Sequence, residues 1–203
     1  MNPLSIITGF IPQVLVFAVL ANWLPLGWAA VAGLAVALAL IAATAAHGGV
    51  KILLVAQAVI LAVFTVVGFT AGHHDATAFE PYARGVASLA LGAFILATSF
   101  SFPFTAQFAR RGVPRQYWNS PRFLAVNRRL SLVWGFAVLA IGVSHLAAGY
   151  IGSGTPVVRI LLDWGVPIFA AYQAYSVTKR TIARSAGQPQ PDGSDQPAAP
   201  SAR

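Results

Sequence analysis

Residues 26–46 read LGWAAVAGLAVALALIAATAA, and residues 52–71 read ILLVAQAVILAVFTVVGFTA. Neither stretch contains a charged side chain, and each is about as long as the 20 residues that an α-helix needs to cross the hydrocarbon core of a bilayer. A helix suits that environment because it pairs every backbone N–H and C=O group within the segment. The two stretches therefore predict an integral membrane protein.

The composition of the whole chain leads to the same class of protein. Of its 203 residues, 57% are hydrophobic and 9% are charged, whereas ordinary soluble domains carry about 25% charged residues. So few charges cannot cover a surface that faces water. The chain contains no cysteine, which excludes a disulfide scaffold and any zinc–thiolate, iron–sulfur or thiol-nucleophile chemistry.

The sequence predicts an all-α, polytopic membrane protein with six transmembrane helices. They lie at about 5–23, 26–46, 52–71, 85–105, 130–150 and 156–178. We interpret the first as a retained helix, because no basic residue precedes it and no cleavage pattern of small residues follows it. Residues 185–203 are rich in Pro, Gly, Ser and Gln, which predicts a disordered cytoplasmic tail after a membrane domain of residues 1–184.

The basic residues segregate between the two predicted sides of the membrane. Six crossings place both termini and the second and fourth connections on one side, where the chain has ten basic residues: Lys51, Arg110, Arg111, Arg115, Arg122, Arg128, Arg129, Lys179, Arg180 and Arg184. The connections on the opposite side have Arg84 alone. Because Lys and Arg concentrate in cytoplasmic loops, we expect a protein of the cell inner membrane with both termini in the cytoplasm.

Two charged side chains fall inside the predicted spans, where charges are costly and mark functional sites. Arg159 and Asp163 are four residues apart on the sixth span, a spacing that places them on one helix face and allows an ion pair. His145 lies at nearly the same depth in the fifth span, which a short connection joins to the sixth. We expect His145, Arg159 and Asp163 to form a polar cluster in the outer half of the membrane, either as a structural bridge or as a functional site.

No motif supports an enzyme, a metal or a cofactor. His73, His74 and Asp75 follow one another in an outer connection, but adjacent residues rarely point at one ion, so we interpret them as a solvated loop. A haem bound by two histidines is not supported, because His145 is the only histidine within a predicted span. The chain has no nucleotide-binding glycine loop, HExxH motif or serine nucleophile elbow. We therefore expect no catalytic activity, no bound metal and no cofactor.

The predicted cytoplasmic loop at 106–129 reads AQFARRGVPRQYWNSPRFLAVNRR and mixes arginines with aromatic residues. Aromatic rings favour the headgroup level of a bilayer, and guanidinium groups attract anionic lipid phosphates. The loop therefore favours binding of anionic phospholipid headgroups or of a protein partner, and not of nucleic acid. The residues that we expect to carry this binding are Arg110, Arg111, Arg115, Trp118, Arg122, Arg128 and Arg129.

Small residues form one face of the predicted second helix, where Ala29, Gly33 and Ala37 follow one another at intervals of four. Such a face allows two helix backbones to approach closely. It serves either packing within the chain or the seam of a homo-oligomer.

Several local patterns resemble the intracellular septation protein A family of inner-membrane proteins. The similarity spans roughly residues 8 to 180 and is greatest in the predicted fifth helix. The residues that carry it are Phe10-Ile11-Pro12, His74-Asp75, Pro103 with Gln107, Arg129-Leu130, Leu132, Trp134, Gly142 and Trp164-Gly165.

This resemblance implies a non-enzymatic scaffold or interaction protein in cell division and envelope maintenance. Its partners would be membrane proteins of the division or elongation machinery. The intramembrane cluster supports an alternative, a small membrane transporter or channel that uses Arg159, Asp163 and His145. A cavity that water can reach and that these three residues line would favour the transporter, whereas a closed, dry bundle would favour the scaffold.

Overall fold

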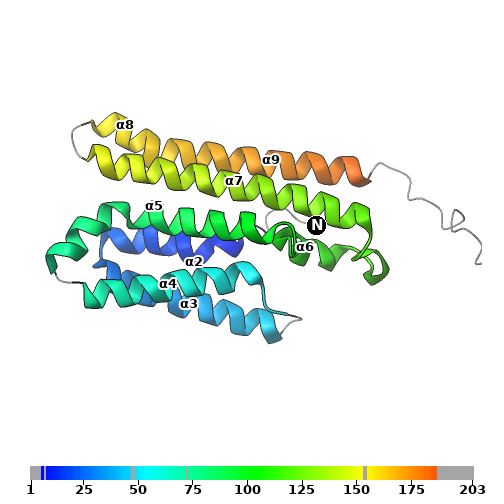
Figure 1. The fold of residues 1–203 in the computed structure, drawn as a ribbon, viewed down its shortest axis with the longest axis horizontal. Helices are drawn as coiled ribbons and strands as arrows, with labels where there is room; N and C mark the ends of the chain where they lie inside the picture. Colours follow the sequence, from blue (N-terminus) through cyan, green and yellow to red (C-terminus); the bar gives the residue numbers. More distant parts are fainter. Residues whose placement is uncertain (1–5, 7, 47–48, 72, 153–154, 187–203) are drawn as a thin grey trace, which may run out of the picture.

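The computed structural model describes residues 6, 8–46, 49–71, 73–152 and 155–186 (Figure 1). All of the secondary structure in this part of the chain is helical, which confirms the prediction of an all-α protein. Residues 187–203, most of the predicted tail, lie outside the described residues, and the last helix continues to Ala186.

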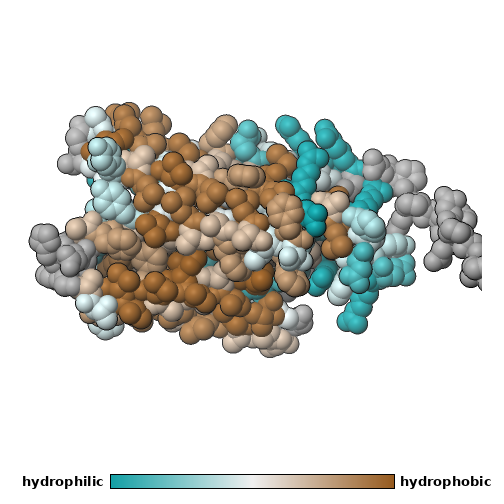
Figure 2. All heavy atoms as spheres, viewed as in Figure 1, coloured by the Kyte–Doolittle hydropathy of each residue, from teal (hydrophilic) through white to brown (hydrophobic). Residues whose placement is uncertain are grey.

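Five stretches in the described part of the chain are long and apolar enough to cross a membrane. Apolar side chains also cover the middle of the molecule, while hydrophilic ones gather at one end (Figure 2). The chain is therefore a polytopic membrane protein. The five stretches are α3 (Leu26–Ala46), α4 (Ile52–Thr70), the Ala78–Thr98 part of α5 (His73–Thr98), α7 (Pro121–Ile151), and Pro156–Arg184, which combines α8 (Pro156–Ile160), the π-helical turn η6 (Leu161–Gly165) and α9 (Val166–Ala186).

The first predicted span, at 5–23, is not a continuous α-helix and is not one of the five. Residues 8–22, here called the N-terminal segment, consist of four short pieces. Pro12 stands in the first turn of the α-helical piece, where its missing N–H group costs nothing. The pieces are η1 (Thr8–Phe10, 3₁₀), α2 (Ile11–Val14), η2 (Leu15–Val19, a π-helical turn) and η3 (Leu20–Asn22, 3₁₀).

Helix α5 begins twelve residues earlier than its predicted span at 85, so the helix contains Pro81. Membrane helices tolerate such a proline when neighbouring groups satisfy the freed backbone. The same extension corrects the interpretation of residues 73–75 as a loop, because their backbone forms the first turn of α5. The Pro81 carbonyl lies against Gly149 of α7, where an added Cβ atom would come within 2.7 Å of the carbonyl oxygen.

The predicted loop at 106–129 is also mostly helical. Helix α7 begins at Pro121, nine residues before the expected start at 130, and its N-cap is Ser120, whose Oγ accepts a hydrogen bond from the Phe123 N–H group at 3.3 Å. This cap and the proline in the first turn favour a helix start at this point. The other helical pieces are α6 (Phe104–Ala109), η4 (Arg110–Gly112) and η5 (Arg115–Tyr117).

Helices α5 and α7 pack antiparallel through glycines and leucines that alternate on both helices. Each leucine covers a glycine of the other helix so closely that a Cβ atom built on the glycine would lie 2.8 Å or less from it. Small residues allow such close backbone approach within a membrane. The pairs are Gly85 with Leu146, Leu89 with Gly142, Gly92 with Leu139, and Leu96 with Gly135.

The small face of α3 packs within the chain, which was one of the two roles predicted for it. Ala29 and Ala37 are fully buried. A Cβ atom on Gly33 would collide with Val16 of the N-terminal segment and would lie 3.3 Å from Leu61 of α4. The face therefore joins α3 to α4 and to the N-terminal segment.

Candidate binding site between the N-terminal segment and α9

Asp163 lies between two arginines. Its Oδ1 atom is 3.5 Å from Arg84 Nη1, and its Oδ2 atom is 3.5 Å from Arg159 Nε. The Asp163 and Arg84 side chains are largely buried, with 19% and 23% of their surface exposed, whereas Arg159 is 51% exposed. The carboxylate therefore forms ion pairs with one largely buried and one exposed guanidinium group.

His145 of α7 contacts the same group of residues. Its Nε2 atom is 3.3 Å from the backbone oxygen of Asp163, and the neighbouring Ser144 Oγ donates a hydrogen bond to the Leu162 carbonyl at 2.6 Å. The His145 side chain is 8% exposed, and its Nδ1 atom is buried without a hydrogen-bond partner. The structure thus brings His145, Arg159 and Asp163 together, as the sequence predicts.

Arg84 is the member of the site that sequence reasoning missed. The sequence places Arg84 in an outer connection, but it lies within the apolar part of α5. One of its Nη atoms also donates a hydrogen bond to the Phe17 carbonyl of the N-terminal segment. The error follows from the interpretation of the polar stretch at 72–84 as a connection between two spans. We call Arg84, His145, Arg159 and Asp163 the polar cluster.

The backbone carbonyls that lie in hydrogen-bond contact with the side chains of Arg84, Ser144 and His145 belong to π-helical turns. Phe17 lies in η2, and Leu162 and Asp163 lie in η6. A π-helical turn has i→i+5 hydrogen bonds instead of i→i+4 bonds, and such turns occur frequently at functional sites. Here they present carbonyl groups to the side chains of Arg84, Ser144 and His145.

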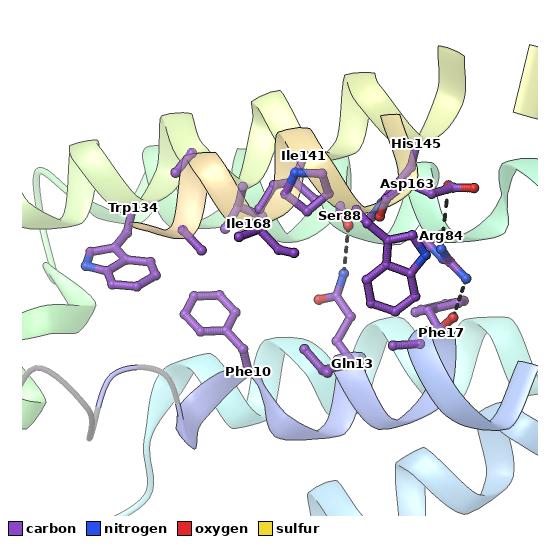
Figure 3. A pocket seen from close by; sticks show the side chains of 17 residues that line it. Phe10, Gln13, Phe17, Arg84, Ser88, Trp134, Ile141, His145, Asp163 and Ile168 are labelled. Carbon is purple, nitrogen blue, oxygen red and sulfur yellow. Dashed lines mark hydrogen bonds and ion pairs between the residues drawn. The ribbon is translucent and has the colours of Figure 1, made fainter. Parts of the chain in front are cut away.

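An apolar cavity of about 300 Å³ extends from the polar cluster along the bundle (Figure 3). The N-terminal segment forms one wall, η6 and α9 form the other, and α5 and α7 form the floor. At the end far from the cluster, the rings of Phe10 and Trp134 stack with 5.6 Å between their centroids. Midway along the floor, Gln13 Nε2 donates a hydrogen bond to Ser88 Oγ at 3.0 Å.

A second cavity, of about 170 Å³, adjoins the other side of the polar cluster. Phe17, Arg84, His145 and Asp163 line both cavities, and all four members of the cluster line the second one. Glu80 also lines the second cavity and accepts a hydrogen bond from the Leu26 N–H group at 3.4 Å. The polar cluster therefore stands between an apolar space and a polar one.

The part of the chain that the structure describes contains no group of three or more His, Asp or Glu residues placed to hold a metal ion. The side chains of the His73-His74-Asp75 stretch lie outside the described residues.

The predicted lipid- or partner-binding residues lie between η4 and the first turns of α7, at the end of the molecule where hydrophilic side chains gather (Figures 1 and 2). We call Arg110, Arg115, Trp118, Arg122, Arg128 and Arg129 the arginine face. The guanidinium groups of Arg110 and Arg115 lie 5.1 and 5.8 Å from the Trp118 ring centroid, at distances typical of cation–π contacts. Trp118 Nε1 donates a hydrogen bond to the Val113 carbonyl at 2.8 Å. The Arg111 side chain lies outside the described residues.

Comparison with known proteins yields no match to a family model, to a curated protein or to a solved structure. The resemblance to the septation protein A family therefore stays a prediction. A fold alone does not define an activity, so the evidence for function lies in the site.

Proposed function

We propose that this protein binds and carries a small amphiphilic molecule within the membrane, without catalysing a reaction. The observation that supports this proposal is the apolar cavity that adjoins a polar cavity at Arg84, Asp163 and His145. Charged residues in membrane spans usually face a bundle interior or a water-filled cavity and mark the path of a substrate. The proposal corresponds to the alternative that the sequence left open beside the scaffold, a small membrane transporter or channel.

The two cavities suit the two parts of such a molecule. Ligand cavities are mostly apolar with a few polar groups that fix the orientation of the ligand, and the first cavity has that character. Its volume of about 300 Å³ lies at the lower end of the range of roughly 300–1,000 Å³ for cavities that bind small molecules. It therefore accommodates one short apolar chain, while the second cavity accommodates a polar headgroup.

Filling the apolar cavity is expected to abolish binding. Ala137 of α7 lines this cavity, so Ala137→Phe would place a ring where the apolar chain of the ligand lies. The full chain in phosphatidylcholine nanodiscs is titrated with single-chain C12 amphiphiles brominated on the chain, and quenching of tryptophan fluorescence reports binding near Trp134 and Trp164. We expect saturable quenching that is at least tenfold weaker in Ala137→Phe.

The matched control is Ala140→Phe, on the exposed face of the same helix, which should bind as the unmodified chain does. Unsaturable quenching of equal strength in all three proteins would show that the amphiphiles enter only the surrounding lipid, and would contradict the proposed function.

We propose the inner membrane as the location, with both termini in the cytoplasm. The support is the positive-inside distribution of the basic residues and their concentration at one end of the molecule. In this orientation the polar cluster lies toward the outer side.

A second candidate function is that of a scaffold in cell division or envelope maintenance that meets anionic lipid or a membrane protein partner. The arginine face favours this candidate, because cation–π contacts hold Arg110 and Arg115 beside Trp118, and aromatic rings and guanidinium groups together suit the headgroup level of a bilayer. Its link to cell division rests on the resemblance to the septation protein A family. A deletion strain that divides normally but no longer takes up an amphiphile would favour the carrier.

Replacing Arg110, Arg111 and Arg115 by alanine is expected to weaken binding of anionic lipid. Each basic residue near an anionic surface contributes about 1 kcal/mol, so the triple variant should lose more than tenfold in affinity for phosphatidylglycerol. Native mass spectrometry of the detergent-solubilised protein measures the bound lipid. Phosphatidylcholine is the control lipid, and its binding should not change. Unchanged retention of phosphatidylglycerol would contradict a lipid role for these arginines.

A further inference from the structure

We infer that the amphiphile has an anionic headgroup, a carboxylate or a phosphate, which binds Arg84 and Arg159 in exchange for Asp163. This inference rests on the proposed function and adds the chemical class of the ligand. It follows from the charges, the distances and one unpaired atom in the polar cluster.

Positive charge exceeds negative charge within the polar cluster. Two guanidinium groups share the single carboxylate of Asp163, each at 3.5 Å, whereas a strong charge-assisted hydrogen bond measures about 2.7–2.9 Å. Asp163 therefore leaves much of the donor capacity of both arginines unused. Glu80, the other acidic residue of the polar cavity, accepts a hydrogen bond from the backbone at the start of α3.

The geometry around Asp163 is one that a ligand anion can reproduce. The two carboxylate oxygens each face one guanidinium group. A free carboxylate or a phosphate monoester also presents at least two acceptor oxygens, and arginine binds both anions through the same planar fork. A headgroup in the polar cavity would thus replace Asp163 without any rearrangement of the arginines.

His145 supplies a further polar contact at the boundary between the cavities. Nearly all buried polar atoms in folded proteins have a hydrogen-bond partner, yet the buried Nδ1 atom of His145 has none. The ring lines both cavities. Because Nε2 donates to the Asp163 carbonyl, Nδ1 of the neutral ring is an acceptor. The P–OH group of a singly protonated phosphate can donate to it, or a doubly protonated ring can donate from Nδ1 to an anionic headgroup oxygen. The apolar chain would then extend along the first cavity toward Phe10 and Trp134 (Figure 3).

The test compares headgroups on one apolar chain. The full protein in phosphatidylcholine nanodiscs is titrated with brominated dodecanoate, dodecyl phosphate and dodecyltrimethylammonium, and tryptophan quenching gives each dissociation constant. We expect both anionic amphiphiles to bind at least tenfold more tightly than the cationic one. Inorganic phosphate and acetate are the competitors that test binding of the headgroup alone, and we expect them to displace the anionic amphiphiles only weakly.

Two substitutions should change the affinity for the anionic amphiphiles in opposite directions. Arg159→Gln removes one half-exposed guanidinium group and should weaken binding about tenfold. Asp163→Asn removes the competing carboxylate and should tighten binding severalfold. The control is Arg180→Gln, which removes one exposed charge near the end of α9 and should leave the affinity unchanged.

The outcomes separate the inference from the function on which it rests. If all three headgroups bind equally well, or if Arg159→Gln binds dodecanoate as tightly as the unmodified chain, the anionic headgroup is wrong and the carrier function stands. If no amphiphile quenches in a saturable manner, the proposed function itself fails. Should Asp163→Asn not fold, the headgroup series and Arg159→Gln decide the question.

Discussion

Replacing Asp163 by leucine is expected to lower the free energy of unfolding by about 3–5 kcal/mol, the usual cost of removing one partner from a buried ion pair. The substitution leaves Arg84, which is 23% exposed, without its carboxylate inside the bundle. The measurement is reversible unfolding in mixed micelles, followed by helical circular dichroism. Asp163→Leu tests stability alone, whereas the isosteric Asp163→Asn retains a polar group beside both arginines.

The control for this effect is Arg159→Leu, which removes the half-exposed partner of the same carboxylate. Exposed ion pairs contribute about 0–1 kcal/mol, so this variant should remain close to the unmodified protein. The double variant Arg84→Met with Asp163→Leu removes both buried charges and should regain most of the lost stability. If Asp163→Leu unfolds as the unmodified chain does, the Arg84 pair has no structural importance.

Replacing Gly142 by leucine is expected to prevent α5 and α7 from packing and to abolish the folded protein. A Cβ atom on Gly142 would lie 2.8 Å from Leu89 Cγ and 2.9 Å from the Leu89 backbone nitrogen. A backbone atom cannot rotate away as a side chain can, and even modest overpacking costs about 1–3 kcal/mol. Size-exclusion chromatography and thermal melting in detergent measure the loss.

Two variants show whether close packing is the cause. Gly165→Ala adds a methyl group where the closest atom, Leu161 Cδ2, is 3.5 Å away, so we expect no loss of stability. Exchanging the pair, with Leu89→Gly and Gly142→Leu together, restores one leucine opposite one glycine and should recover part of the fold. Full stability of Gly142→Leu alone would contradict the close approach of the two helices.

The sequence predicts the regular apolar helices well. The bounds of α3 agree with the predicted span at 26–46, and α4 ends one residue before the predicted end at 71, because the run of apolar residues is the same length as the helix. Hydropathy alone reveals only the part of a helix that lies in hydrocarbon. Helices α5 and α7 extend beyond that part into polar turns, so their starts were predicted too late.

The sequence predicts only those members of the polar cluster that lie close together in the chain. Arg159 and Asp163 are one helical turn apart, and a short connection brings His145 near them. Arg84 is distant in sequence and enters the site through the packing of α5 on α7. The interval of seven between Gly85 and Gly92, repeated between Gly135 and Gly142, was the available signal for that packing.

The π-helical turns could not be predicted, because such turns are rare and follow from tertiary contacts. One of them, η2, interrupts the first predicted span together with two 3₁₀ turns. Apolar residues fill the span, but its backbone departs from α-helical hydrogen bonding beside the polar cluster.

Each π-helical turn amounts to one extra residue inserted into a helical wall of the cavity: η6 lies between α8 and α9, and η2 follows the short helix α2. Successive residues of an α-helix are about 100° apart around its axis. Conversion of η2 or η6 to regular α-helix would therefore rotate the adjoining residues of that wall by about 100° around the helix axis. Both turns flank the same cavity, and Arg84 links the two through Phe17 and Asp163. The closely packed pair α5 and α7 thus forms the floor between two walls, and the directions of the side chains in each wall depend on a π-helical turn.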